Sequence, residues 1–266
     1  MNAPILVLLT TLLCGADVPV EPQQLAERLS KLSMEERKAA FAALDEGGRR
    51  AVLEAVTSEQ WLQLHREVVA GLGVYRVKLE KVERVDGKLV GPQTLELLIR
   101  EKPQAIYAEY VAGPAKGRRL LYSAELKKDA LRVREAGMLG FAGAVWLSLD
   151  SGLVRKDSNH AVTELGLSPL LGLLGRELEK AKAFGGLKRT VEGVRDGLYC
   201  NRYDAPPGAK GLYAKSTRIC GDPVTGLPAY VEVHDDEGLL EKLTYSNVRP
   251  NQKVPADAFT LEGARL

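Results

Sequence analysis

The sequence lacks an excess of charge of either sign. Its 37 lysines and arginines and 35 aspartates and glutamates give a formal net charge of +2. A nucleic-acid-binding surface needs a concentrated basic footprint. Arg118-Arg119 and Lys127-Lys128 are only short basic pairs, so the charge pattern argues against nucleic acid as a partner.

Catalytic and metal-binding motifs are also missing. The sequence contains no glycine-rich phosphate loop, no His-Glu-x-x-His motif and no nucleophile elbow. Its three histidines, His65, His160 and His234, are far apart in the chain, and isolated histidines are more often structural than catalytic. We therefore expect a protein that is not an enzyme and has no cofactor and no metal. An enzyme is the third hypothesis, and it requires a cleft that brings His160 to Asp157 or Glu164.

The apolar run at the N-terminus, residues 5–14, is too short to span a bilayer as a stable anchor. Small residues follow it at Cys14-Gly15-Ala16, as they do at a signal-peptidase site. We predict that residues 1–16 are a cleaved signal peptide and that the mature protein is exported, to the periplasm. A buried N-terminal helix is one alternative. Acylation of Cys14 is another, although Leu13 occupies the position where bacterial lipoboxes have a small residue.

Cysteine is scarce, with three in the whole chain. Removal of residues 1–16 would leave Cys200 and Cys220, and an even pair in an exported protein indicates one disulfide. The residues between them include Pro206-Pro207-Gly208, which would let two neighbouring strands return to each other. Two separate buried thiols are the alternative.

Residues 17–72 have the pattern of short helices. Ser33, Asp45 and Thr57 are N-cap residues spaced twelve apart, and Glu36 completes a capping box with Ser33. We predict three or four helices of two to three turns each. They are expected to form a helical appendage that packs on the rest of the protein, although their amphipathic pattern would also suit a partner surface.

From Val74 the hydrophobic period changes to two, and residues 73–266 are predicted to form one domain of antiparallel strands. Asp86-Gly87 supplies a hairpin turn, and the hairpin over residues 227–248 is expected to form the closing edge of the sheet. An apolar helix is predicted to begin with Ser168 as N-cap and Pro169 as its first residue. This helix and the segment over residues 138–146 are the expected covers of the apolar face.

Three segments together resemble a known family. They are the strand from Tyr75 to Val82, Lys102-Pro103 followed by Ile106-Tyr107 and Tyr110, and the ending from Leu227-Pro228 to Phe259. They resemble domain of unknown function 1571, a bacterial family similar in fold to the periplasmic LolA/LolB carriers of outer-membrane lipoproteins. The resemblance implies an α+β fold: a curved antiparallel β half-barrel, LolA-like and covered by a helix, with the N-terminal helices as an appendage.

The resemblance also implies where a ligand would bind. The apolar side chains that alternate along the strands would line the cavity, and leucines of the central helix would form its lid. These residues are Val77, Leu79, Leu97, Ile99, Ile106 and Tyr110 on the strands, and Leu170, Leu171 and Leu174 on the helix. The implied partners are a lipid or a lipoprotein acyl chain, with peripheral contact to a membrane. An ordinary packed core remains an equal interpretation of the same residues.

Two functions therefore stay open. The first is an exported, non-enzymatic envelope protein that binds a lipid or an acylated or apolar ligand in the half-barrel. The second is a structural or adaptor domain of the envelope, with a fully packed barrel and partners docked on the N-terminal helices. The distinguishing observation is whether the space between the sheet and the helix at residues 168–184 is filled.

Overall fold

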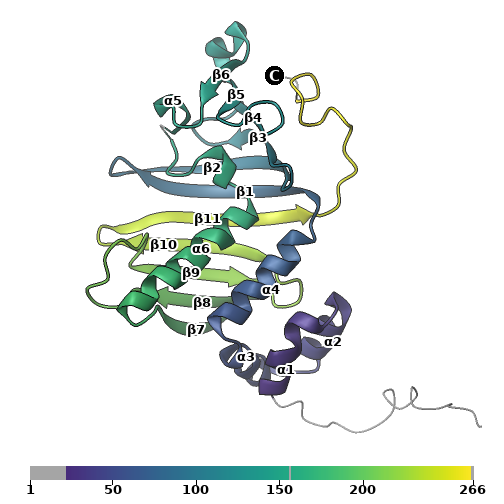
Figure 1. The fold of residues 1–266 in the computed structure, drawn as a ribbon, viewed down its shortest axis with the longest axis vertical. Coiled ribbons are helices and arrows are strands. Elements are labelled where there is room, and N and C mark those ends of the chain that lie inside the picture. The colour runs from purple at the N-terminus through teal and green to yellow at the C-terminus, as the bar shows by residue number, and fades with distance from the viewer. Residues whose placement is uncertain (1–21, 156, 265–266) are drawn as a thin grey trace, which may run out of the picture.

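The structure is a computed structural model that describes residues 22–155 and 157–264. The predicted signal peptide and Cys14 lie outside the described residues. Within the described chain, eleven antiparallel strands form one sheet in the order β6-β5-β4-β3-β2-β1-β11-β10-β9-β8-β7 (Figure 1). The strands are β1 (Val74–Val85), β2 (Lys88–Arg100), β3 (Ala105–Ala112), β4 (Arg119–Ser123), β5 (Ala130–Arg134), β6 (Val145–Ser148), β7 (Lys188–Arg195), β8 (Leu198–Asp204), β9 (Ser216–Gly221), β10 (Pro228–Asp235) and β11 (Gly238–Arg249).

The C-terminal hairpin lies in the centre of this sheet. The prediction that it forms the closing edge is wrong, because β11 pairs with β1 over most of the length of both strands. The sheet consists of two meanders, β1–β6 and β7–β11, and the β1–β11 pair joins them. Long strands have many ladder hydrogen bonds to satisfy, and the sequence pattern of a strand does not show which partner satisfies them.

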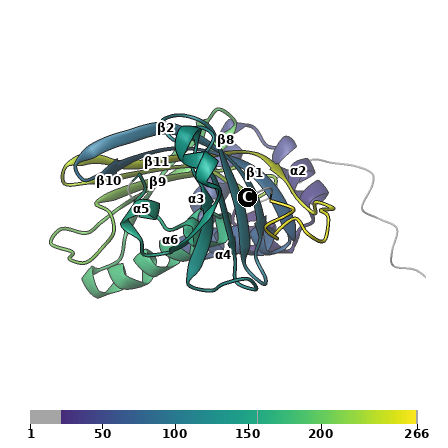
Figure 2. The same ribbon diagram turned by 90° about the horizontal axis from the view of Figure 1, so that it is seen from above.

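Two helices cover one face of the curved sheet. Figure 2 shows α4 (Ser58–Ala70) and α6 (Leu167–Ala181) on the same side of the sheet, inside its curvature. Leucines of both helices join the inward rows of the strands in the largest apolar core, which includes Leu62, Leu171, Val77 and Leu97. The predicted curved antiparallel half-barrel with a helical cover and N-terminal helices is confirmed.

The tight turns follow from their residues. Asp86 and Gly87 connect β1 to β2 with φ angles of 50° and 76°, the conformation that a two-residue hairpin turn needs. Gly238, with φ of 104°, ends the acidic turn between β10 and β11. Arg84 pairs with Asp235 and Glu237 of that turn.

The N-terminal helices begin at the expected caps. They are α1 (Pro22–Arg28), a 3-10 turn η1 (Leu29–Lys31), α2 (Met34–Ala42), α3 (Glu46–Ala55) and α4. Ser33 and Thr57 each form a complete capping box, and the Asp45 side chain accepts a hydrogen bond from the backbone of Gly48. These helices share a second apolar core that includes Phe41, Val52 and Trp61, together with Tyr199 of β8. The expected boundary at residue 72 falls between α4 and β1.

The cover over the inner face differs in two ways from its prediction. Helix α6 begins two residues earlier than predicted, with Gly166 as N-cap, because the hydroxyl of Tyr75 accepts a hydrogen bond from the Leu167 N–H at 3.2 Å. In place of the predicted cover, residues 138–146 belong to a 3-10 turn, η2 (Gly137–Ala142), and the edge strand β6. Met138 is 87% exposed and Trp146 36% exposed. Pairing to β5 holds β6 at the sheet edge.

The segment between β6 and α6 covers part of the inner face instead. It contains α5 (Gly152–Arg155) and η3 (Val162–Glu164). Two glutamine side chains of the sheet region bind its backbone: Gln93 Nε2 of β2 donates to the Asp157 carbonyl, and Gln104 Nε2, from the turn before β3, donates to the Thr163 carbonyl. After β11, the C-terminal residues Phe259 and Ala264 pack on Leu98, Ala105 and Leu121, which belong to a separate apolar cluster. Among the described helices, none is long and apolar enough to cross a bilayer.

Candidate functional site

The inward row of β1 changes from apolar to charged along the strand. Tyr75, Val77 and Leu79 point into the main core, and the next two residues of the same row are Lys81 and Glu83. Both charged side chains are 1% exposed. Burial of a charge is costly unless the charge is paired and hydrogen-bonded, so the structure must compensate these two charges locally.

A second buried carboxylate lies opposite the first. Glu241 of β11 is directly across from Glu83 in the β1–β11 register and is also 1% exposed. Like charges directly opposite each other on a sheet are destabilising. The pair therefore needs positive charge close to both carboxylates.

Lys81 and Ser158 compensate Glu83. The Lys81 ammonium forms a buried ion pair with Glu83 and donates to Ser158 Oγ at 2.8 Å. The Ser158 hydroxyl donates to the other Glu83 oxygen at 3.2 Å, and the Asn159 backbone N–H donates to that oxygen at 3.3 Å. Glu83 is thus held by one cation and two neutral donors.

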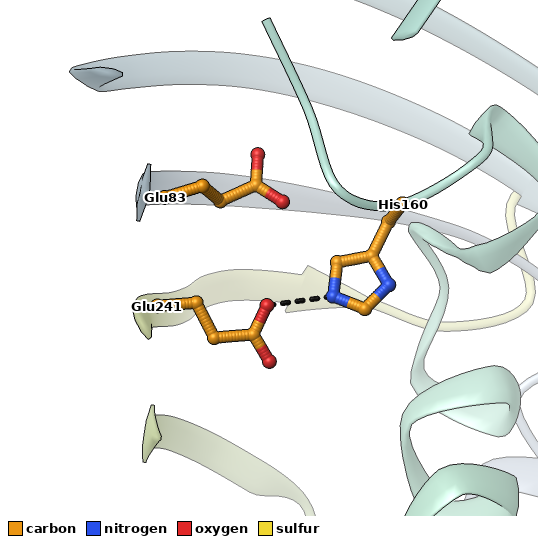
Figure 3. A group of neighbouring side chains, drawn as sticks. All are labelled: Glu83, His160 and Glu241. Carbon is orange, nitrogen blue, oxygen red and sulfur yellow. Dashed lines mark hydrogen bonds and ion pairs between the residues drawn. The ribbon is translucent and has the colours of Figure 1, made fainter. Parts of the chain in front are cut away.

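His160 performs the same role for Glu241. It lies in the covering segment, with its side chain 16% exposed, and its Nε2 is 2.6 Å from Glu241 Oε2 (Figure 3). The other ring nitrogen, Nδ1, is 3.7 Å from Glu164 Oε2. Tyr213 adds a hydroxyl 3.4 Å from Nε2. Figure 3 shows Glu83 and Glu241 extending from neighbouring strands toward the imidazole.

The electrostatics follow from these contacts. Burial lowers the pKa of His160, but the contacts with Glu164 and Glu241 and the nearby carboxylate charges outweigh burial and raise it to about 10. The close contact with His160 lowers the pKa of Glu164 to about 2. Burial, followed by the charge of Glu241, raises the pKa of Tyr213. His160 is therefore protonated at neutral pH and lies next to both buried glutamates.

A cavity of about 420 Å³ lies beside this cluster, between α6, β1, β11 and the covering segment. One part of its wall is apolar, and the other part is formed by the charged cluster together with Arg155 and Arg176. The apolar lining residues are Leu79, Leu165, Leu170, Leu173, Leu243 and Tyr245. A neighbouring space of about 40 Å³ lies under α6 against β9 and β10.

All nine side chains expected to line a ligand cavity are buried in the main core. Three of them also line a cavity: Leu79 and Leu170 face the larger one, and Leu170 and Leu174 face the smaller one. The other six pack away from both cavities: Val77, Leu97, Ile99, Ile106, Tyr110 and Leu171.

The sequence pattern did not predict the charged cluster as a whole. His160 was expected to be an isolated histidine or, under the enzyme hypothesis, to lie near Asp157 or Glu164, and no metal site was expected. In the structure, His160 meets Glu164 and, from 81 residues away in the sequence, Glu241. The signal was present in the strand pattern, because Lys81, Glu83 and Glu241 occupy inward positions of strands whose other inward residues are apolar.

The donor set of the cluster could hold a metal ion. Glu83, His160 and Glu241 each offer one ligand atom, and these atoms all lie within 4.8 Å of one another. One imidazole nitrogen with two carboxylate oxygens suits divalent transition metals. The same groups also suit hydrogen bonding to a polar ligand.

The disulfide lies on another part of the sheet. Cys200 of β8 and Cys220 of β9 are in register, with a Cα–Cα distance of 4.0 Å, and form a disulfide.

Sequence comparison gives the family. The sequence profile described as "Protein of unknown function (DUF1571)" matches residues 73–263. The chain belongs to the DUF1571 family. The match runs from β1 into the C-terminal segment and leaves the N-terminal helices outside, so the expected family is confirmed. No curated protein matches this DUF1571 chain in sequence.

Solved structures with a similar arrangement include a LolA superfamily protein and two proteins described by their relation to lipoproteins. The LolA superfamily protein from Nitrosomonas europaea is 13% identical, with 77% of this chain and 98% of that chain covered and a TM-score of 0.33. Lipoprotein LppX from Mycobacterium tuberculosis is 14% identical, with 75% and 100% covered and a TM-score of 0.42. A putative outer membrane lipoprotein-sorting protein domain from Vibrio parahaemolyticus is 11% identical, with 78% and 97% covered and a TM-score of 0.42. Similarity at this level does not indicate the function of the DUF1571 chain, which has to be inferred from its own residues.

Proposed function

We propose that this protein binds one amphiphilic molecule, a hydrocarbon chain with a polar head, in the cavity between α6 and the β1–β11 pair. The observation that supports the proposal is the division of the cavity wall into a leucine-lined part and a charged part. Its volume of about 420 Å³ is within the range of small-molecule sites, roughly 300–1,000 Å³. The proposed role is binding without chemical conversion of the ligand.

The apolar part suits a hydrocarbon chain. Leu165, Leu170 and Leu173 come from the cover, and Leu79 and Leu243 come from the sheet, so a chain between them would contact apolar groups on two sides. Each buried methylene contributes about 0.8 kcal/mol. A chain of several methylenes would therefore bind measurably even before its head makes a contact.

The basic residues of the cavity favour an anionic head. Arg176 lines the cavity, is exposed and forms no ion pair with another described residue. Arg155 lines it as well, and its ion pair with Asp150 is long, at 3.9 Å. Arginine binds carboxylate and phosphate groups through paired N–H donors. We expect a fatty acid or an acylated phosphate head to fit this arrangement.

The packed part of the interior supports a second candidate. Six of the nine expected lining residues belong to the main core and line neither cavity, and the second cavity under α6 is about 40 Å³. A largely filled half-barrel is also what a structural or adaptor domain of the envelope would have. That candidate expects partner capture through the N-terminal helices and no ligand in the cavity.

Native mass spectrometry of protein purified from the cell envelope tests the proposal. We expect a bound mass that organic extraction removes, and displacement of a fluorescent fatty acid by the extracted compound. Leu173→Trp would fill the cavity and reduce fatty-acid binding at least about tenfold, since most of the buried chain would be excluded. Leu178→Trp is the matched control, because Leu178 lines a different cavity, between α6 and the N-terminal helices.

Three outcomes would contradict the proposal, each in a different part. A clean apo mass with no fatty-acid uptake would favour the adaptor candidate. Equal loss of uptake in both tryptophan variants would place the binding site elsewhere. A ligand recovered in chemically altered form would indicate turnover by the His160 cluster.

Export is part of the proposal. The Cys200–Cys220 disulfide supports it, since such bonds persist mainly in oxidising compartments. We expect the mature protein in the periplasmic fraction, with its N-terminus at Asp17 by intact-mass analysis. A mature N-terminus at an acylated Cys14 would instead identify a lipoprotein.

A further inference from the structure

We propose that Glu83, His160 and Glu241 form a binding site for one divalent transition-metal ion of the Zn²⁺ type. The inference goes beyond ligand binding and does not depend on it. Three independent features of the cluster lead to it: the distances between the donor atoms, the network behind them and the free side toward the cavity.

The donor atoms are already close to metal-binding distances. All three lie within 4.8 Å of one another, and Nε2 of His160 is 2.6 Å from Glu241 Oε2. Zinc binds histidine nitrogen and carboxylate oxygen at about 2.0–2.2 Å. An ion placed between the imidazole and the two carboxylates therefore needs side-chain adjustments only, with the strands left in their register.

The residues that contact the proposed ligands resemble those around a metal-bound histidine. Glu164 faces Nδ1 of His160 at 3.7 Å while Nε2 faces the proposed ion position. A histidine that binds zinc commonly donates its other ring N–H to a carboxylate, which fixes the ring and increases its basicity. Glu83 is fixed in a similar way by Ser158 and by the Asn159 backbone.

The charges also suit a cation. Glu83 and Glu241 are opposite each other and buried, and Lys81 pairs with Glu83 alone. A divalent ion would take the place of the proton on His160 Nε2 and would attract both carboxylates. The nitrogen donor favours zinc and similar transition metals over calcium, magnesium and manganese, which prefer oxygen ligands.

The site has a free side. All three residues line the cavity of about 420 Å³, so a three-ligand ion would face open space there. A fourth ligand, a water molecule or an oxygen of a bound head group, can reach it from the cavity. Three protein ligands and one exchangeable position are typical of accessible zinc sites.

Native mass spectrometry with ZnCl₂ added to the chelator-treated full chain tests the site. We expect one Zn²⁺ per chain, with His160→Gln and Glu241→Gln binding more than about tenfold more weakly and Glu164→Gln about tenfold more weakly. His234→Gln is the matched control. His234 also contacts a glutamate, Glu232 at 2.9 Å, but its side chain is 42% exposed and outside the cluster.

A second measurement uses only the unaltered chain, in case a variant fails to fold. Co²⁺ bound by one nitrogen and two oxygens in a four-coordinate site gives intense visible absorption, which addition of Zn²⁺ should abolish at one equivalent. Absence of both Zn²⁺ binding and the Co²⁺ spectrum in the unaltered chain would overturn the inference. So would binding that persists in His160→Gln and is lost in His234→Gln. Leu173→Trp should keep its Zn²⁺, so the metal site and the ligand site can fail separately.

Discussion

At the scale of single residues, His65 is a histidine that the fold keeps neutral. It is fully buried on α4, with its ring edge-on to Trp61 at a centroid distance of 4.6 Å. Its Nδ1 contacts the Gly226 carbonyl, and its Nε2 has no hydrogen-bond partner among the described residues. Burial lowers the pKa of His65 to about 4, although the contact with Gly226 acts in the opposite direction.

This pKa predicts a loss of stability in acid. Between pH 6.5 and pH 4 the unfolded chain binds a proton at this position and the folded chain does not, so the free energy of unfolding falls as pH falls. The shift from 6.5 to about 4 corresponds to a loss on the order of 3 kcal/mol. Urea unfolding of the wild type and of His65→Leu at pH 7 and pH 4 measures it. We expect the wild type to lose more stability than the variant by this amount, and parallel pH profiles would contradict the assignment.

At the scale of elements, locally determined features were predictable and distant ones were not. Ser33, Asp45 and Thr57 begin helices as expected, because a cap is decided within three residues of the chain. The start of α6 was misplaced because Tyr75, 92 residues earlier, binds its first N–H. The C-terminal hairpin was predicted at the edge of the sheet and lies in its centre. Alternation along a strand shows which of its side chains are buried, but it does not show which strand lies beside it.

The caps give a prediction for α4. The Thr57 hydroxyl accepts from the Gln60 N–H at 3.1 Å, and the Gln60 side chain accepts from the Thr57 N–H at 2.8 Å. Because α4 contributes Leu62 to the main core and Trp61 to the helical core, fraying of its first turn should weaken both. Thr57→Ala should lower the free energy of unfolding by about 1 kcal/mol.

Thr57→Ser is the control for this prediction. Serine keeps the hydroxyl acceptor and the capping box, so urea unfolding should place it within a few tenths of a kcal/mol of the wild type. A serine variant as unstable as the alanine variant would show that the methyl group of Thr57, and not its cap, carries the effect.

Only part of the candidate site could be predicted from the sequence, because its contacts join residues that are distant in the chain. Lys81 and Glu83 could be recognised as charged residues in a buried strand position, since alternation places them in one row with Leu79. Glu241 could be recognised in the same way from Leu243 and Tyr245. His160 could not, because a segment without periodicity gives no indication of the strand it will cover.

At the scale of the whole molecule, the cluster lies where the two meanders meet. Glu83 belongs to the first meander and Glu241 to the second, and the β1–β11 pair puts them face to face. The covering segment then reaches both strands through Ser158 and His160. The site is complete only when both meanders and the cover are in place, so cation binding at this site would stabilise the folded state as a unit.

The disulfide joins two strands of the second meander, and we expect its removal to lower the stability of the whole fold. Cys200 and Cys220 join neighbouring strands β8 and β9 across a sequence separation of 20 residues. Closing a loop of that length restricts the unfolded chain and stabilises the fold by roughly 3 kcal/mol. We expect the double variant Cys200→Ala with Cys220→Ala to lose about that amount in urea unfolding. Addition of reductant should destabilise the wild type to a similar degree and leave the double variant unchanged. If reductant lowers the stability of both proteins equally, the effect arises elsewhere, and the cysteine pair contributes less than loop closure predicts.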